Sequence, residues 1–125
     1  MNARRELGIA EAVLRAVERR AAGRLVRRAR VRVGALLHIS GPALKQAFIA
    51  VSDGTVADGA RLEVVVEPAR LGCRSCGRTT MSDRMLATCP ACEGNRLDLH
   101  SGDGLVLESV EFTEAERRVG HEPSS

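Results

Sequence analysis

The chain has 125 residues, of which 44% are apolar and 28% are charged, and its net charge is +3. This length fits one domain with a small appended module, and the composition is that of a folded chain rather than a disordered one. No run of about 18 apolar residues is present, which excludes a transmembrane helix, and the spaced apolar residues at the start predict no signal peptide. We therefore expect a cytoplasmic protein whose cysteines stay reduced or bind metal.

The charge is unevenly distributed along the chain. Residues 1–32 contain ten arginines and three glutamates, so they carry +7, and the remainder carries −4. Such a basic segment indicates either a solvated surface or a contact with nucleic acid or an acidic protein. Phe48 and Phe112 are the only aromatic residues, which argues against the base stacking typical of single-strand binding.

The first third of the chain predicts a helix followed by a strand. Over residues 6–22, apolar residues recur with the 3.6-residue period of one helix face, and Gly23 ends this helix. Residues 25–33 then alternate valine or alanine with arginine in their second half. This alternation predicts a strand with one buried face.

The middle and end of the chain predict a second helix and two further strands. Ser40 and Pro42 supply an N-cap and an N-terminal proline for the helix. Residues 61–67 are rich in β-branched side chains and predict a strand, as do residues 105–112. In the last strand, the apolar residues expected to face inward change from Leu105 and Leu107 to Val110 and Phe112, so the alternation is broken between them. This change predicts a bulge near Ser109.

These elements predict an α+β fold in which two helices pack on a small three-stranded mixed sheet. A zinc-ribbon-like module is inserted before the last strand. We expect residues 1–69 and 99–112 to form the α/β domain, residues 70–98 to form the zinc-binding module, and residues 113–125 to be a flexible tail.

The inserted module contains all four cysteines in two C-x-x-C pairs. Two intervening residues let a tight turn direct both sulfurs at one ion, as in tetrahedral zinc sites with Zn–S distances of about 2.3 Å. Four protein ligands leave no open position, so the zinc is predicted to be structural. Since the module has few large apolar residues, its folding should depend on the metal. The predicted zinc ligands are Cys73, Cys76, Cys89 and Cys92.

Three other roles for these cysteines were weighed. Two disulfides are disfavoured by a reducing compartment. A redox dithiol is expected at a helix N-terminus within a βαβ pattern, which neither pair has. A rubredoxin-like iron site is the strongest alternative, because iron and zinc both accept four thiolates.

Several segments together resemble the hydrogenase maturation nickel metallochaperones of the HypA/HybF family. They are ELGIAEAVL, RVRVGAL, PALKQAF, the paired cysteines and LHSGDGLVLESVEF, which span about residues 6–112. The resemblance implies a protein that assists nickel insertion into nickel-iron hydrogenase, with structural zinc and transiently bound nickel. It implies a nickel-handling GTPase and the hydrogenase large subunit as partners. No catalytic constellation stands out, so we expect no enzyme.

The chain departs from this family at its expected nickel site. Members typically begin Met-His-Glu and bind nickel there, whereas here Glu6 aligns with the glutamate and Arg5 stands in the place of the histidine. A guanidinium cannot ligate a cation. The candidate nickel ligands are therefore Glu6 and His38, the latter lying just before the second helix. For His100 and His121, as for most lone histidines, a structural or solvated role is the commoner one.

Three functions follow, in order of preference. The first is nickel delivery to hydrogenase through a site other than Met-His-Glu. The second is a divergent paralogue that acts as a zinc-stabilised adaptor without nickel. The third is a zinc-ribbon nucleic-acid binder, which is weakened because the basic charge lies outside the module.

Overall fold

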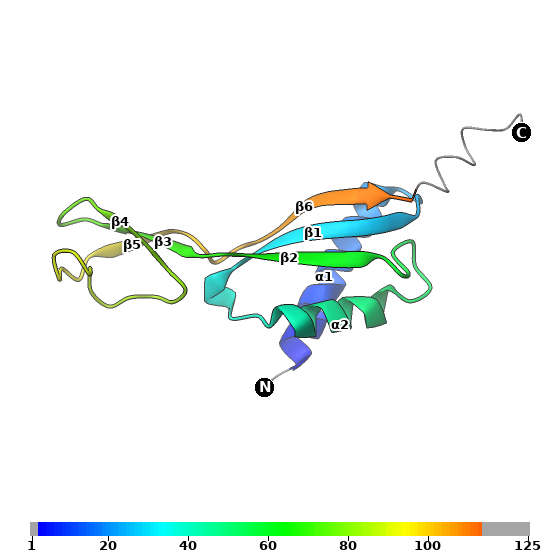
Figure 1. Ribbon diagram of the computed structural model, residues 1–125, viewed down its shortest axis with the longest axis horizontal. Coiled ribbons are helices and arrows are strands. Elements are labelled where there is room, and N and C mark those ends of the chain that lie inside the picture. Colours follow the sequence, from blue (N-terminus) through cyan, green and yellow to red (C-terminus); the bar gives the residue numbers. More distant parts are fainter. Residues whose placement is uncertain (1–2, 114–125) are drawn as a thin grey trace, which may run out of the picture. The chain divides into compact units, whose positions relative to one another are not determined.

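The computed structural model describes residues 3–113 of the chain. The strands form two three-stranded sheets, ordered β2-β1-β6 and β4-β3-β5. In chain order, the elements are α1 (Ala3–Ala21), β1 (Val26–Gly34), the short 3-10 helix η1 (Ala35–Leu37), α2 (Gly41–Ser52), β2 (Arg61–Glu67), β3 (Ala69–Cys73), β4 (Thr79–Ser82), β5 (Leu97–Ser101) and β6 (Leu105–Phe112) (Figure 1).

The predicted α+β class is confirmed, with one addition. Strands β2 and β6 have the predicted bounds, and α1 begins three residues earlier than predicted, at Ala3. The second sheet was not predicted, because its strands are only four or five residues long and so give a weak local signal. No helix in the described residues is long and apolar enough to cross a membrane.

The contacts within the chain divide it into two compact units. Within the described residues, the first unit takes the chain up to Val31, Ile39–Val64 and the residues from Leu107. The second unit takes Arg32–His38 and Val65–Val106, and so contains the cysteines. The domain boundaries expected from the sequence, at residues 69/70 and 98/99, stay a prediction.

The first sheet is mixed. Arg28 and Arg32 of β1 pair with Glu63 and Glu67 of β2 at the same offset in sequence, as in parallel strands. By contrast, β1 and β6 run antiparallel, since the N–H of Gly34 donates to the carbonyl of Gly104 while the other end of the ladder joins residues 25 and 113.

The core of the first unit lies between the helices and this sheet. Both helices lie against the same face of β1, β2 and β6 (Figure 1). The predicted alternation of β1 is confirmed, because Ala29 and Val31 are buried whereas Arg28 and Arg30 reach the other face. Phe48 and Leu44 of α2 are fully buried. The other buried apolar residues of this unit are Ala10, Val13, Val17, Ala21, Val26, Ala57, Ala60 and Leu62.

The outer face of the first unit's sheet carries paired arginines and glutamates. Glu111 bridges two cations, at 2.6 Å from both Arg27 and Arg28. The hydrogen bond from Arg28 holds the pKa of Glu111 below its usual value. Glu108 pairs with Arg30 at 3.1 Å. Glu108 and Glu111 both contact arginines on this outer face, although residues three apart in a regular strand point to opposite faces. Their contacts therefore support the predicted change of parity near Ser109.

Two glycines allow close backbone approach in the second unit. A side chain on Gly34 would collide with the backbone of Gly102, and one on Gly102 would collide with Ala69. Gly102 also has φ +109°, a conformation that favours glycine. The N–H of Leu36 donates to the carbonyl of Gly102 over 2.9 Å, so this approach is part of the backbone hydrogen-bond network.

Phe48→Ala tests whether the first unit depends on its one buried aromatic ring. Phe48 is 0% exposed, so its truncation should leave a cavity and lower the free energy of unfolding by about 3–5 kcal/mol. Ile49→Ala is the control, because Ile49 is 61% exposed and its truncation should change stability by no more than about 0.5 kcal/mol. Urea unfolding followed by circular dichroism measures both. Equal losses for the two variants would contradict this placement of the core.

Candidate metal centre

Three short strands position the four cysteines. β3 pairs antiparallel with both β4 and β5, and Cys73 is its last residue. Cys76 follows in the turn between β3 and β4, while Cys89 and Cys92 lie in the connection between β4 and β5. Because both connections leave from the same small sheet, they bring the two cysteine pairs together.

The four sulfur atoms lie within 4.8 Å of one another. The Sγ atoms of Cys73 and Cys92 are 3.6 Å apart, and those of Cys76 and Cys89 are 3.8 Å apart. A disulfide requires about 2.05 Å, so the four thiols are free in this structure. A tetrahedral ion with metal–sulfur distances of about 2.3 Å would separate its ligands by about 3.8 Å. The four side chains therefore fit one tetrahedrally bound metal ion.

The two cysteine turns have the same backbone hydrogen bonds. In the first, the N–H of Cys73 donates to Arg78 and the N–H of Gly77 returns to Cys73. In the second, the N–H of Cys89 donates to Gly94 and the N–H of Glu93 returns to Cys89. These four bonds are 2.7–2.9 Å long. Equivalent turns direct each pair of sulfurs at a common point.

Backbone amides also donate to the sulfurs. The N–H groups of Cys76, Ala91 and Gly94 point at the Sγ atoms of Cys73, Cys89 and Cys92 over 3.5, 3.4 and 3.3 Å. Such bonds stabilise thiolates and offset part of the negative charge of a metal tetrathiolate.

The thiols do not ionise independently. The N–H of Cys76 lowers the pKa of Cys73 to about 6, and the N–H of Cys92 lowers the pKa of Cys89. For Cys92, the N–H of Gly94 lowers the pKa, but the neighbouring sulfurs and burial outweigh it and raise the pKa to about 11. The other three sulfurs thus oppose ionisation of Cys92, and a bound cation would allow all four thiols to be ionised at neutral pH.

The second unit has few apolar residues to stabilise it. Among its described residues, the buried apolar positions are Val33, Ala69, Leu71, Cys73 and Cys89, and of these only Val33 and Leu71 are aliphatic side chains larger than alanine. So small a core cannot offset the entropy of ordering about forty residues. Metal binding at the sulfurs would supply the missing free energy.

The structure places the two candidate nickel ligands differently. Glu6 is 5% exposed, and its Oε2 accepts a hydrogen bond from the backbone N–H of Ser40 over 3.1 Å. Its Oε1 has no partner among the described residues. His38 is exposed and follows η1 with φ +52°. In the described part of the chain, the cysteines are the one cluster of three or more side chains arranged to hold a metal ion.

The structure also shows where the other residues indicated by the sequence lie. Ser40 is the predicted N-cap of α2, with its Oγ accepting from the N–H of Ala43 over 3.2 Å. Arg5 is exposed on α1, and His100 is exposed with its ring over Gly72. Residues 1–2 and His121 lie outside the described residues.

Sequence reasoning missed the strained position Glu93. Its φ is +65°, whereas the equivalent position of the first turn is Gly77 with φ +80°. Positive φ is costly for a residue with a Cβ and nearly free for glycine. The signal was present in the sequence, because superposing the two C-x-x-C turns aligns Glu93 with Gly77.

Glu93→Gly should therefore strengthen the second turn. Removing the Cβ relieves about 1 kcal/mol of backbone strain, so chelator-induced metal release should slow and thermal unfolding should shift upward. Gly77→Ala is the matched control and should act in the opposite direction. Both variants can be followed with a colorimetric chelator during heating. A Glu93→Gly variant that loses metal faster would contradict the strain argument.

A search of family models gives a match over residues 5–112 of this chain. The matching family is described as "Hydrogenase/urease nickel incorporation, metallochaperone, hypA". The match covers α2, all the strands, the four cysteines and all of α1 except its first two residues.

Curated relatives and solved structures agree with this match. The chain is 41% identical over 108 residues to hydrogenase maturation factor HypA of Archaeoglobus fulgidus, covering 84% of this chain and 94% of the relative. It is 32% identical over 109 residues to hydrogenase maturation factor HybF of Escherichia coli K12, covering 85% and 96%. The solution structure of the Ni metallochaperone HypA from Helicobacter pylori shares the fold, with a TM-score of 0.62 at 20% identity and coverage of 86% and 96%. The chain belongs to the HypA/HybF family of hydrogenase maturation nickel metallochaperones.

Proposed function

We propose that this chain assists nickel insertion into nickel-iron hydrogenase while a structural zinc ion holds its second unit together. The observation that carries this proposal is a family match over residues 5–112 in a chain whose four sulfurs are arranged for one tetrahedral ion. Family membership is the ground for proposing nickel delivery, and the cysteine geometry is the ground for proposing structural zinc.

Zinc is assigned to Cys73, Cys76, Cys89 and Cys92 as a structural ion. A set of four thiolates suits zinc, and it leaves no open coordination position for water or cargo. Cys73 and Cys89 are buried, whereas Cys76 and Cys92 are exposed. The nickel ion, as cargo, must therefore bind elsewhere.

We assign the nickel donors to Glu6 and His38. Oε1 of Glu6 is buried without a partner among the described residues, and a buried carboxylate oxygen is costly unless a cation or donor reaches it. The imidazole of His38 is exposed and supplies the nitrogen donor that Ni(II) favours. Arg5 cannot act as a ligand, so each of these side chains is proposed separately as a nickel donor in place of the usual Met-His-Glu set.

The proposed partners are a nickel-handling GTPase and the hydrogenase large subunit, met in the cytoplasm. The family's role implies contact with hydrogenase maturation components. We assign no catalytic activity of its own to the chain, which acts by holding and transferring the metal.

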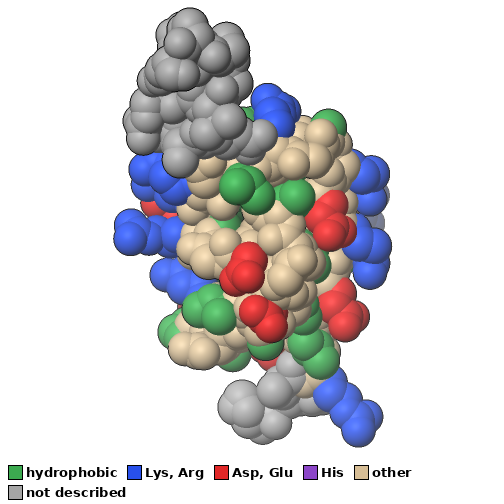
Figure 2. Space-filling view, turned by 90° about the vertical axis from the view of Figure 1, so that its right-hand side faces the viewer, with side chains coloured by type: hydrophobic (Ala, Val, Ile, Leu, Met, Phe, Trp, Pro, Cys, Tyr) green, Lys and Arg blue, Asp and Glu red, His purple; other side chains and the backbone are tan. Residues whose placement is uncertain are grey.

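Nucleic-acid binding is disfavoured by the way the arginines are paired. Arg27, Arg28 and Arg30 of β1 contact glutamates on the neighbouring strands, so most of the positive charge of that strand is neutralised. On the face drawn in Figure 2, acidic side chains lie between basic ones rather than apart from them. A continuous basic surface, which phosphate binding requires, is not present on that face.

Cys76→Ser tests the structural role of the zinc. The substitution removes one thiolate, so zinc content should fall well below one equivalent and residues 70–98 should lose amide protection. Elemental analysis and hydrogen exchange measure the two effects. Ser75→Ala is the control, because it changes the same turn without touching a ligand. Retention of a full equivalent of zinc by Cys76→Ser would overturn the ligand assignment.

Nickel titration of the zinc-loaded chain tests the cargo site. We expect about one equivalent to bind, and Glu6→Gln and His38→Ala each to weaken it by at least about tenfold, since each loses a direct donor. His100→Ala is the control, because His100 is also exposed but is not a proposed ligand. Isothermal titration calorimetry gives the affinities.

A second comparison separates nickel delivery from the adaptor alternative. Arg5→His, in a chain shortened to begin Met-His-Glu, should bind nickel more tightly than the natural chain. If only this variant takes up nickel and the natural chain takes up none, the adaptor function replaces nickel delivery.

A further inference from the structure

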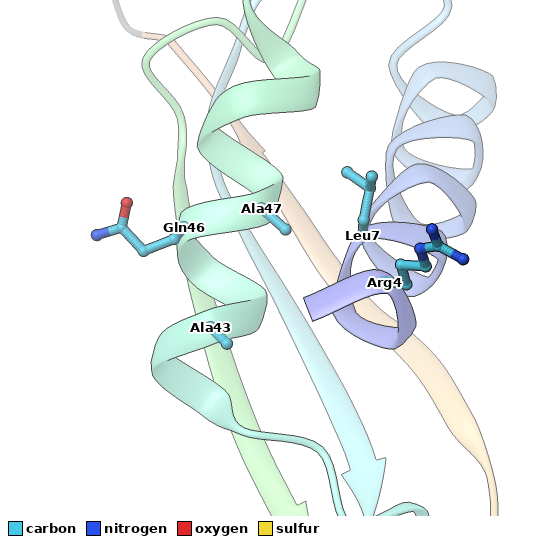
Figure 3. A pocket seen from close by; sticks show the side chains of 5 residues that line it. All are labelled: Arg4, Leu7, Ala43, Gln46 and Ala47. Carbon is cyan, nitrogen blue, oxygen red and sulfur yellow. The ribbon is translucent and has the colours of Figure 1, made fainter. Parts of the chain in front are cut away.

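Two hollows in the first unit differ in their chemistry. The hollow between α1 and α2 has an apolar floor with two polar side chains at its margins, and it is lined by Arg4, Leu7, Ala43, Gln46 and Ala47 (Figure 3). The other hollow has a volume of about 250 Å³ and is lined by Arg27, Arg28, Gly59 and Arg61. Three of the four residues in this second lining are arginines. We call it the arginine pocket.

Two arginines of β1 reach the arginine pocket because the strand departs from its alternation there. Val26 and Ala29 are both buried, although residues three apart in a regular strand point to opposite faces. Arg27 and Arg28, which stand between them, both contact Glu111 and so lie on the same side. A bulge produces such a pair, and bulges often re-aim side chains beside functional sites.

The glutamates beside these two arginines orient them without using all of their donors. Arg27 donates only through Nη2, to Glu111, so its Nε and Nη1 make no hydrogen bond within residues 3–113. Arg28 donates through Nη1 to Glu63 and through Nη2 to Glu111, and its Nε is likewise unused there. Since a guanidinium carries five N–H donors, both side chains keep donors for a ligand.

Arg61, the first residue of β2, supplies positive charge that these glutamates leave unbalanced. Its side chain is exposed, and its guanidinium makes no hydrogen bond or ion pair with the residues that the structure describes. Glu63 is bonded to Arg28 instead, over 2.9 Å. Asp58 precedes the pocket residue Gly59, but it does not line the pocket and accepts from the backbone N–H of Gly54. The three arginines with their two glutamates therefore carry +1.

Gly59 leaves the arginine pocket open on the side of the loop before β2. Nothing lies within 4 Å of the position that a Cβ would take there, and its φ of +78° favours glycine. A small ligand could therefore enter beside this loop without displacing a side chain.

We propose that the arginine pocket binds a phosphate group, either as inorganic phosphate or as the phosphoryl group of a larger molecule. Guanidinium groups bind phosphate oxygens through paired N–H donors. Arginines that converge from two strands suit an anion with several oxygens better than a carboxylate, which has two. The volume of about 250 Å³ is below the roughly 300–1,000 Å³ of pockets for drug-sized ligands. The pocket thus suits a phosphate group rather than a whole nucleotide.

This site differs from a nucleic-acid interface and does not depend on nickel delivery. A nucleic acid would need a continuous basic surface, whereas one phosphate group needs only the three arginines. The competing occupant is a carboxylate of the chain itself. Glu114 and Glu116 follow in sequence after β6, the strand that carries Glu111, and they lie outside the described residues.

The test titrates inorganic phosphate into the zinc-loaded full chain at constant ionic strength. NMR spectroscopy should show saturable shifts of the Gly59 amide and of the arginine Nε signals that line the pocket. Arg61→Gln should weaken binding by at least about tenfold, whereas Arg15→Gln should change it by less than about twofold. Arg15 is the matched control, because it is exposed on α1 and does not line the pocket. Zinc content and melting temperature establish that both variants are folded.

A nucleoside monophosphate, titrated in parallel, distinguishes the two sources of the phosphate group. Shifts of the same residues with both ligands support a site that accepts a phosphoryl group on a larger molecule, and shifts with inorganic phosphate alone support a site for the free ion. The absence of saturable shifts with either ligand overturns the proposal, as does equal weakening by the two variants. Binding that appears only after removal of residues 114–125 also overturns it, because the arginines would then serve that segment of the chain.

Discussion

The second unit depends on bringing four sulfur atoms to one point. Among the described residues of this unit, only Val33 and Leu71 are buried aliphatic side chains larger than alanine, so hydrophobic burial alone cannot order the three short strands. Two equivalent turns, each closed by the same pair of backbone hydrogen bonds, hold the sulfurs about 3.6–3.8 Å apart in the two closest pairs. At that separation four thiolates repel one another, which makes the unit dependent on a cation. A metal ion bound to these four sulfurs would therefore be part of the fold.

Sequence reasoning found the features that local pattern determines. Both helices, the alternating strand β1 and the bounds of β2 and β6 follow from periodicity and end signals. It missed β3, β4 and β5, because strands of four or five residues give a weak local signal and are ordered by pairing between separate segments. It also missed the close approach of Gly34 and Gly102, since a glycine required by a distant backbone has no local signal.

The candidate sites were predictable to different degrees. Cysteine spacing identified the sulfur cluster, because four ligands in two tight turns form a local pattern. The environment of Glu6 was not predictable, since its burial and its hydrogen bond to Ser40 depend on how α1 packs against α2. Its Oε1 has no hydrogen-bond partner among residues 3–113, which no sequence pattern could indicate. That oxygen is a structural reason, independent of family resemblance, to expect a cation or donor there.

The basic first third of the chain divides into two parts with different roles. Along β1, arginines are paired with glutamates on the neighbouring strands, with Glu111 contacting Arg27 and Arg28 and Glu63 also contacting Arg28, so this part contributes ordered surface rather than a free charge. At the start of α1, the acidic residue turns inward to Ser40 while Arg4 and Arg5 stay outside. The two parts of the basic segment therefore differ in where their acidic residues lie: those that match β1 lie across the sheet, whereas the acidic residue at the start of α1 lies inside, against the first residues before α2.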